Sequence, residues 1–275
     1  MTNARIAARF AALKAEGRAA FVPYVMAGDP DAETALAILK GLPGIGADLI
    51  EVGFPFSDPM AEGPPIQRAA QRALAKGMTL KATLAAIRAF RDGDDATPVI
   101  LMGYMNPLIT WGIEAFARDA AVAGVDGMIV VDCPPEEADP LADALEANGL
   151  SLIFLTTPTT DDRRLPTVIR RASGFVYYVS VAGVTGVKEA DADAVAPNVA
   201  RIREASGLPV AVGFGIKTPE RAAAIAKVAD AVVVGSALVD EVAAALAANE
   251  DVTRRVLTKA QALAKAVRAA RRVPA

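Results

Sequence analysis

Short apolar runs alternate with amphipathic stretches along nearly the whole chain. The apolar runs are four to six residues long, and most are uninterrupted, as is typical of parallel strands buried on both faces. They predict strands over residues 21–25, 47–52, 98–102, 127–131, 151–155, 175–179, 209–212 and 231–234.

The stretches after these strands have the periodicity of amphipathic helices. They predict helices over residues 32–39, 66–75, 80–90, 113–123, 136–147, 163–171, 195–204 and 218–227, and a further helix that opens at Gly235-Ser236. A helix at each end of the chain is also predicted, because apolar residues such as Ile6 and Phe10, or Val256 and Leu263, share one helical face. Residues 103–107 are predicted to form a loop.

Eight strand–helix units in a chain of this length are the pattern of a (β/α)8 TIM barrel. We predict an α/β fold of this kind, a single TIM-barrel domain over residues 1–275 with extra N-terminal and C-terminal helices. A doubly wound open sheet is the structural alternative, but its GxGxxG fingerprint is absent after the first strand. Polar clusters follow the C-terminal ends of the predicted strands, where barrel enzymes keep their active sites.

The composition is that of a globular protein, with 53% hydrophobic and 22% charged residues. A net charge of −3 gives no basic footprint for nucleic acid. The longest uncharged run, residues 96–113, is broken by Pro98, Gly103 and Pro107 and predicts a strand and a loop, not a membrane span. Cys133 is the only cysteine, which fits a reducing compartment and a cytoplasmic location.

The chain contains no histidine. This absence excludes the Ser-His and Cys-His dyads and nearly all zinc sites. Acid–base chemistry must therefore come from carboxylates, tyrosine or lysine. No lysine lies within a predicted strand, which also excludes a Schiff-base lysine set in a strand of the barrel.

Three carboxylates gather around the second predicted strand. Glu51 lies near its C-terminal end, and Asp58 and Glu62 lie in the Pro- and Gly-rich loop after it. A carboxylate in an apolar strand is costly to bury unless it is paired or takes part in chemistry. Tyr177, in the sixth strand, could point into the barrel mouth beside them. Alternatives without this chemistry stay open: Glu51 could be a buried acid with its hydrogen bonds satisfied, the loop a rigid connector, and Tyr177 a core aromatic residue. The three acids could also form a magnesium site.

Glycine motifs follow the last two predicted strands. Gly213-Phe214-Gly215-Ile216 comes after strand seven and Gly235-Ser236 after strand eight, where barrels usually bind phosphate. Glycine lets backbone N–H groups approach the phosphate oxygens closely, and Gly186 could close the third side. The residues favour metal-free proton transfers by two carboxylates on a small phosphorylated substrate. An isomerase, an epimerase and a carbon–carbon lyase all stay open on these residues.

Longer motifs carry a resemblance to a known family. Residues 49–59 read Leu-Ile-Glu-Val-Gly-Phe-Pro-Phe-Ser-Asp-Pro and continue to Gly63-Pro64 and Ile66-Gln67. Phe21-Val22-Pro23-Tyr24 with Gly28-Asp29-Pro30, then Gly183-Val184-Thr185-Gly186 and the two glycine motifs, lie in the family's order. Together they resemble the tryptophan synthase alpha chain over essentially the whole sequence.

The resemblance implies a retro-aldol cleavage of indole-3-glycerol phosphate to indole and glyceraldehyde 3-phosphate in the last stage of tryptophan biosynthesis. It implies that Glu51 protonates indole C3 and helps deprotonate the glycerol hydroxyl, that Glu62 hydrogen-bonds the indole N–H, and that Tyr177 orients the substrate. It also implies an indole pocket lined by Tyr24, Met102 and Tyr104. The phosphate would be held by Gly186, Phe214, Gly215, Gly235 and Ser236, and Thr185 would help to close the loop over the site.

The resemblance also implies a partner, a pyridoxal-phosphate beta chain in an alpha-beta-beta-alpha heterotetramer. Pro55, Phe56 and Asp58 would face that chain, and this chain would itself hold no cofactor and no metal. The family pattern has Asp where this chain has Glu62, and the longer side chain must rotate or retreat to meet the same N–H. Two alternatives stay open: another phosphosugar isomerase or epimerase, and a weakly active barrel that mainly activates a beta chain.

Overall fold

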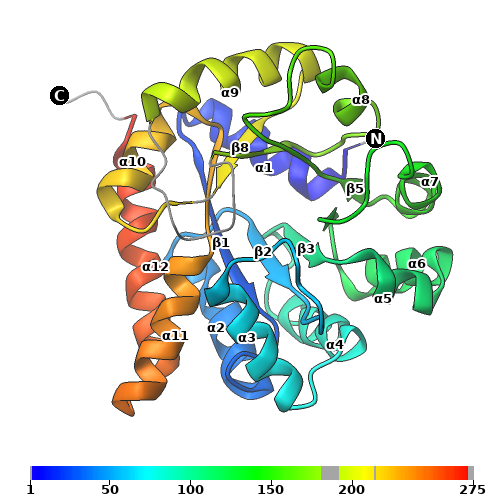
Figure 1. Ribbon diagram of the computed structural model, residues 1–275. Helices are drawn as coiled ribbons and strands as arrows, with labels where there is room; N and C mark the ends of the chain where they lie inside the picture. The colour runs from blue at the N-terminus through cyan, green and yellow to red at the C-terminus, as the bar shows by residue number, and fades with distance from the viewer. Residues whose placement is uncertain (1, 181–191, 214, 272–275) are drawn as a thin grey trace.

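The structure is a computed structural model that describes residues 2–180, 192–213 and 215–271. Parallel strands form a nearly closed barrel with helices around it (Figure 1). The strands are β1 (Ala20–Met26), β2 (Ile50–Gly53), β3 (Val99–Gly103), β4 (Gly127–Val130), β5 (Ser151–Leu152), β6 (Phe154–Thr156), β7 (Val176–Val179), β8 (Val210–Gly213) and β9 (Ala231–Val234). Their order is β5-β4-β3-β2-β1-β9-β8-β7-β6, and the predicted (β/α)8 barrel is confirmed.

One predicted strand, residues 151–155, is divided in the structure. Its first part, β5, pairs with β4, and its second part, β6, pairs with β7. Between them, the N–H of Ile153 donates to the carbonyl of Met128 at 2.9 Å, so the segment stays attached to β4 until it turns toward β7. The two short strands therefore occupy one position of the barrel, and the described strands fill eight positions.

The described helices surround the strands (Figure 1). They are α1 (Ala4–Ala15), α2 (Ala32–Gly41), α3 (Pro64–Ala75), α4 (Leu80–Arg91), α5 (Met105–Trp111), α6 (Ile113–Ala123), α7 (Asp139–Ala147), α8 (Leu165–Ile169), α9 (Ala192–Ser206), α10 (Pro219–Val228), α11 (Ser236–Ala248) and α12 (Val252–Ala269), with a 3₁₀ turn, η1, at Pro43–Ile45. The C-terminal helix α12 packs against α2, α10 and α11. Among the described residues, no helix is both long and apolar enough to cross a membrane.

The loop predicted over residues 103–107 is wrong, because helix α5 begins at Met105. Pro107 lies in the first turn of α5, where a backbone N–H has no partner within the helix, so the proline costs no hydrogen bond. The carboxylate of Asp132, after β4, accepts the N–H of Met105 at 2.8 Å. Leu108 is the buried residue of this short helix and packs into the core.

Three aspartates tie neighbouring strands together at the N-terminal end of the barrel. Each lies just before a strand, and its side chain accepts the N–H of a residue at the start of the adjacent strand. The pairs are Asp48 with Phe21 at 2.9 Å, Asp126 with Val99 at 2.8 Å, and Asp230 with Val210 at 2.9 Å. Side-chain hydrogen bonds thus hold neighbouring strands together at this end of the barrel.

Candidate active site

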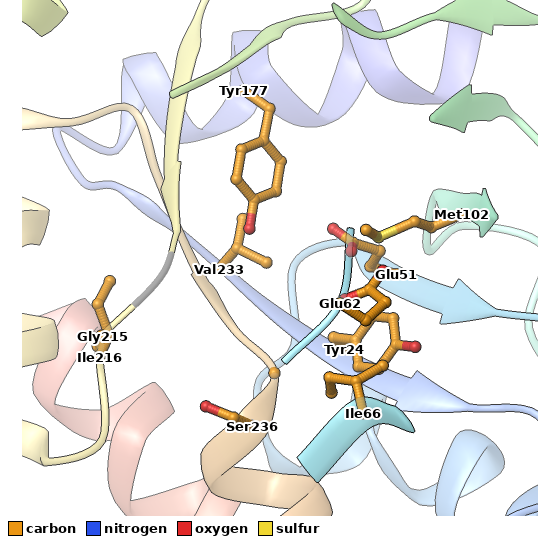
Figure 2. A pocket seen from close by; sticks show the side chains of 11 residues that line it. Tyr24, Glu51, Glu62, Ile66, Met102, Tyr177, Gly215, Ile216, Val233 and Ser236 are labelled. Atoms are coloured by element: carbon orange, nitrogen blue, oxygen red, sulfur yellow. The ribbon is translucent and has the colours of Figure 1, made fainter. Parts of the chain in front are cut away.

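A cleft opens at the C-terminal end of the barrel strands (Figure 2). It holds about 480 Å³ of space between atoms, part of which is open to solvent. Figure 2 shows Tyr177 pointing into the cleft from one wall and Glu51 and Met102 from another. The lining side chains are Tyr24, Glu51, Glu62, Ile66, Met102, Tyr177, Gly215, Ile216, Val233, Gly235 and Ser236.

Glu51 stands in β2, where the strand register places it beside Tyr24 of β1 and Ile100 of β3. Its exposed fraction is 2%, and its Oε2 atom has no hydrogen-bond partner among the described residues. Burial, and next the negative charge of Glu62, raise the pKa of Glu51 to about 8. Near neutral pH this side chain is therefore mostly a carboxylic acid, with a proton to give.

Glu62 reaches the same cleft from the loop between β2 and α3. Its backbone N–H donates to Pro59 at 3.1 Å, and its carbonyl accepts the side-chain amide of Gln67 at 2.9 Å. Its side chain is buried, and burial raises the pKa of Glu62 to about 7. Two carboxyl groups that titrate near neutral pH thus share one cleft, which is the arrangement expected of an acid–base pair.

Two tyrosine rings reach the cleft because glycine stands at the end of a neighbouring strand. A Cβ on Gly213 would lie 1.9 Å from the hydroxyl oxygen of Tyr177, and one on Gly53 would lie 2.2 Å from that of Tyr24. Burial, and then the charges of Glu51 and Glu62, raise the pKa of Tyr177 well above its ordinary value. This hydroxyl therefore stays protonated beside the two carboxylates.

The wall opposite the carboxylates contains the residues predicted to bind phosphate (Figure 2). Gly215 has φ +72°, a left-handed conformation that suits glycine. Gly235 is the N-cap of α11 and Ser236 its first residue, so the N–H groups of this helix end lie at the cleft. A helix N-terminus attracts anions. The other residues predicted here, Gly186 and Phe214, lie outside the described residues.

The sequence has close counterparts among known proteins. The family model of the tryptophan synthase alpha chain matches residues 10–268. The tryptophan synthase alpha chain of Phenylobacterium zucineum is 80% identical over 272 residues, 99% of this chain and 98% of that one. The alpha chain of Caulobacter vibrioides is 72% identical over 271 residues, 98% of each chain. This chain belongs to the tryptophan synthase alpha chain family.

Solved structures lead to the same family. The crystal structure of tryptophan synthase subunit alpha from Legionella pneumophila matches with a TM-score of 0.90 and 42% sequence identity, and the match covers 97% of this chain and 99% of that one. The resemblance carried by the sequence motifs is thereby confirmed. The reaction of the tryptophan synthase alpha chain is the cleavage of indole-3-glycerol phosphate, a carbon–carbon lyase step in tryptophan biosynthesis.

The residues that line the cleft do not include every residue that the family pattern implies. The ring of Tyr104 stacks on Phe56 with centroids 5.1 Å apart, and its hydroxyl accepts the N–H of Ala61 at 3.1 Å. Tyr104 thus contacts the loop after β2, and the lining residues given above do not include it. Thr185, predicted to close the site, lies outside the described residues.

The loop that would face a partner chain is partly exposed. Pro55 is buried, Phe56 is half-buried, and Asp58 is exposed and accepts the hydroxyl of Ser57 at 2.5 Å. Because Asp58 is exposed, its carboxylate is not part of the buried pair formed by Glu51 and Glu62. Within the described ranges, no group of three or more acidic, histidine or cysteine side chains is placed to hold a metal ion.

Three apolar residues of the cleft, Ile66, Ile216 and Val233, were not predicted from the sequence. Val233 lies within an unbroken apolar strand, so alternation could not show which of its neighbours faces inward. Ile66 and Ile216 lie in motifs that are recognised by their glycine and proline residues. An apolar residue in such a motif does not by itself indicate that it lines a cleft.

Proposed function

We propose that this chain cleaves indole-3-glycerol phosphate to indole and glyceraldehyde 3-phosphate by a retro-aldol reaction in the cleft at the C-terminal end of the barrel. The observation that carries the proposal is the pair of buried carboxyl groups, Glu51 and Glu62, facing a helix N-terminus across one small cleft. The carboxyl groups suit acid–base chemistry at the indole ring, and the helix end suits the phosphate.

In the proposed reaction, Glu51 donates its proton to indole C3. Protonation makes the ring an electron sink, so the bond between C3 and the glycerol carbon can break. The bonding electron pair returns to the ring, and the glycerol hydroxyl loses its proton to the Glu51 carboxylate as the aldehyde forms. The pKa of about 8 supports this role, because the acid is protonated at neutral pH and its conjugate base is strong enough to recover a proton.

Glu62 would accept the indole N–H and stabilise the positive charge that the ring acquires on protonation. The carboxylate must be ionised to do so, and a pKa of about 7 leaves a large ionised fraction at neutral pH. The ionised form also favours protonated Glu51, because its negative charge raises the pKa of that group. The reaction thus begins with Glu51 protonated and Glu62 ionised, and the two pKa values fit these states.

The remaining side chains would bind the substrate. The protonated hydroxyl of Tyr177 would orient the glycerol part, and Tyr24 and Met102 would contact the indole ring. Gly215, Gly235 and Ser236 would hold the phosphate through N–H groups and one hydroxyl. The roles of Tyr104 in the indole pocket, of Gly186 and Phe214 at the phosphate, and of Thr185 in loop closure stay predictions.

The name of the family implies a beta chain as the partner. We propose that the loop with Pro55, Phe56 and Asp58 faces that chain in an alpha-beta-beta-alpha heterotetramer, and that pyridoxal phosphate belongs to the beta chain alone. The exposed Asp58 supports this placement. A metal-free reaction and a cytoplasmic location are part of the same proposal, and the free thiol of Cys133 suits a reducing compartment.

The test is indole release from indole-3-glycerol phosphate by the purified chain, with and without an added beta chain. We expect release by the wild type and a loss of about hundredfold or more in Glu51→Gln, because the amide cannot supply the proton. Glu62→Asp keeps the charge and reports whether the longer side chain slows the reaction. If the wild type releases no indole under either condition but stimulates the beta chain, the chain is an activator and the lyase proposal fails.

A further inference from the structure

We propose that Tyr104 is a positioning residue that holds the carboxylate of Glu62 in the cleft by fixing the loop backbone next to it. The proposal rests on the proposed function, in which Glu62 acts on the indole ring. Tyr104 is 3% exposed although it lies near an exposed loop, so the fold buries a tyrosine hydroxyl at this point. A buried hydroxyl needs a partner, and the identity of that partner indicates what the residue does.

The partner of the Tyr104 hydroxyl is a backbone group. The oxygen accepts the N–H of Ala61 at 3.1 Å, and Ala61 directly precedes Glu62. This bond holds the peptide unit between Met60 and Ala61, one residue before the Cα that carries the Glu62 side chain. On the other side, the amide of Gln67 donates to the carbonyl of Glu62 at 2.9 Å. The backbone of Glu62 is therefore held from both directions.

The ring of Tyr104 holds the beginning of the same loop. It stacks on Phe56, with centroids 5.1 Å apart and an interplanar angle of 26°. Between these two contacts the loop is exposed at Ser57 and Asp58, and Met60 is 76% exposed. One side chain thus anchors the loop at its start and at its end, while the residues between the anchors are free to meet another surface.

Tyr104 itself is fixed by the ends of two strands. The next residue, Met105, donates its N–H to the carboxylate of Asp132 at 2.8 Å. The preceding residue is Gly103, and a Cβ there would lie 2.1 Å from the ring of Phe54, so that ring lies directly against the backbone. The anchor is therefore rigid, which is what a residue that positions another side chain requires.

The first experiment replaces Tyr104 by phenylalanine, which keeps the ring and removes only the acceptor oxygen. We expect kcat for indole release to fall about tenfold with KM within about twofold, because a displaced carboxylate stabilises the transition state less well. Tyr178→Phe is the matched control, since Tyr178 is an equally buried tyrosine that does not line the cleft. We expect that variant to keep the wild-type kcat.

A double-mutant cycle separates positioning from a general loss of structure. If Tyr104 acts through Glu62, Tyr104→Phe should cause no further loss in the Glu62→Gln background. Phe56→Leu, which removes the ring stack and leaves the hydroxyl, should show a smaller loss with the same dependence on Glu62. Equal fold losses with and without the Glu62 carboxylate would overturn the proposal.

Amide hydrogen exchange at Ala61 gives a readout that needs no activity. We expect this N–H to exchange several-fold faster in Tyr104→Phe than in the wild type and to be unchanged in Tyr178→Phe. Unchanged exchange in Tyr104→Phe would overturn the proposal, even if the enzyme is active. If instead the wild type releases no indole but Ala61 responds as expected, the proposed function has failed, while the anchoring of Glu62 by Tyr104 stands.

Discussion

Glu51 carries a cost for stability that has the same origin as its chemistry. Its pKa is about 8 in the folded chain and 4.5 as the ordinary value. As the pH rises, the unfolded chain therefore loses the proton first, and the native state loses stability between about pH 4.5 and pH 8. Below the lower value both states are protonated, and this contribution vanishes. The residue proposed to transfer the proton thus lowers the stability of the fold near neutral pH.

The prediction is that Glu51→Gln stabilises the chain in a pH-dependent way. We expect the free energy of unfolding to rise by on the order of 3 kcal/mol at pH 8, because the amide stays neutral, and to change little at pH 4. Urea unfolding at the two pH values measures the difference. The same gain at both would mean that packing, and not ionisation, sets the effect.

Gly213 shows a second constraint at the residue scale, because its missing side chain leaves room for Tyr177. We expect Gly213→Ala to lower kcat/KM for indole release by about ten- to hundredfold, since the new Cβ would lie 1.9 Å from the tyrosine hydroxyl and must displace it. Gly44→Ala is the control, because a Cβ at Gly44 meets nothing within 4 Å. Wild-type activity in Gly213→Ala would show that the position of Tyr177 is not critical.

At the scale of elements, the aspartates at the N-terminal end of the barrel make a ranked prediction. Asp126 is fully buried and binds Arg5 at 2.9 Å, Arg91 at 2.6 Å and the N–H of Val99 at 2.8 Å. The side chain of Asp230 is 27% exposed, so water can replace part of the hydrogen bonding that a substitution there removes. Both Asp126 and Asp230 join two strands, but of these two only Asp126 does so without access to solvent.

We expect Asp126→Asn to lower the free energy of unfolding by about 3 kcal/mol, because it leaves two arginines beside a neutral amide in a buried site. The same change at Asp230 should cost about 1 kcal/mol. Chemical denaturation compares the two variants. Equal losses would contradict the argument from burial. Indole release should be kept in both folded variants, since these residues lie at the far end of the barrel from the cleft.

Element by element, the sequence predicted the strands and most helices because their apolar periodicity is regular. It missed α5, since Gly103 and Pro107 resemble a loop and the carboxylate of Asp132 that supports the helix comes from a distant part of the chain. It also missed the division at Ile153, which depends on how the barrel closes and not on local composition. Both misses concern tertiary contacts that a local pattern does not contain.

At the scale of the molecule, the fold class followed from the count of strand–helix units, and the family followed from the motifs. The depth of burial that raises the pKa of Glu51 required the structure, because unbroken apolar strands do not show which face is inside. The contact of Tyr104 with the loop also required it. One domain over residues 1–275 stays a prediction.

Assembly with a beta chain gives the last prediction. The loop after β2 is buried where it carries Glu62 and exposed at Asp58 and Met60. If that exposed part contacts the beta chain, binding restrains the same loop that carries Glu62, the carboxylate proposed to act on the indole ring. We therefore expect the beta chain to increase indole release by this chain, and Asp58→Ala to lower the rate with the beta chain several-fold more than the rate without it.

Asp92→Ala is the matched control, because Asp92 is an exposed aspartate at the C-terminal end of α4, away from the loop. Titration of each variant with the beta chain, followed by indole release, separates weaker binding from weaker activation. Weaker binding raises the beta-chain concentration needed for half of the effect, whereas weaker activation lowers the plateau. A response to Asp58→Ala no larger than that to Asp92→Ala would place the partner on another face. Tyr104 would then hold Glu62 independently of assembly.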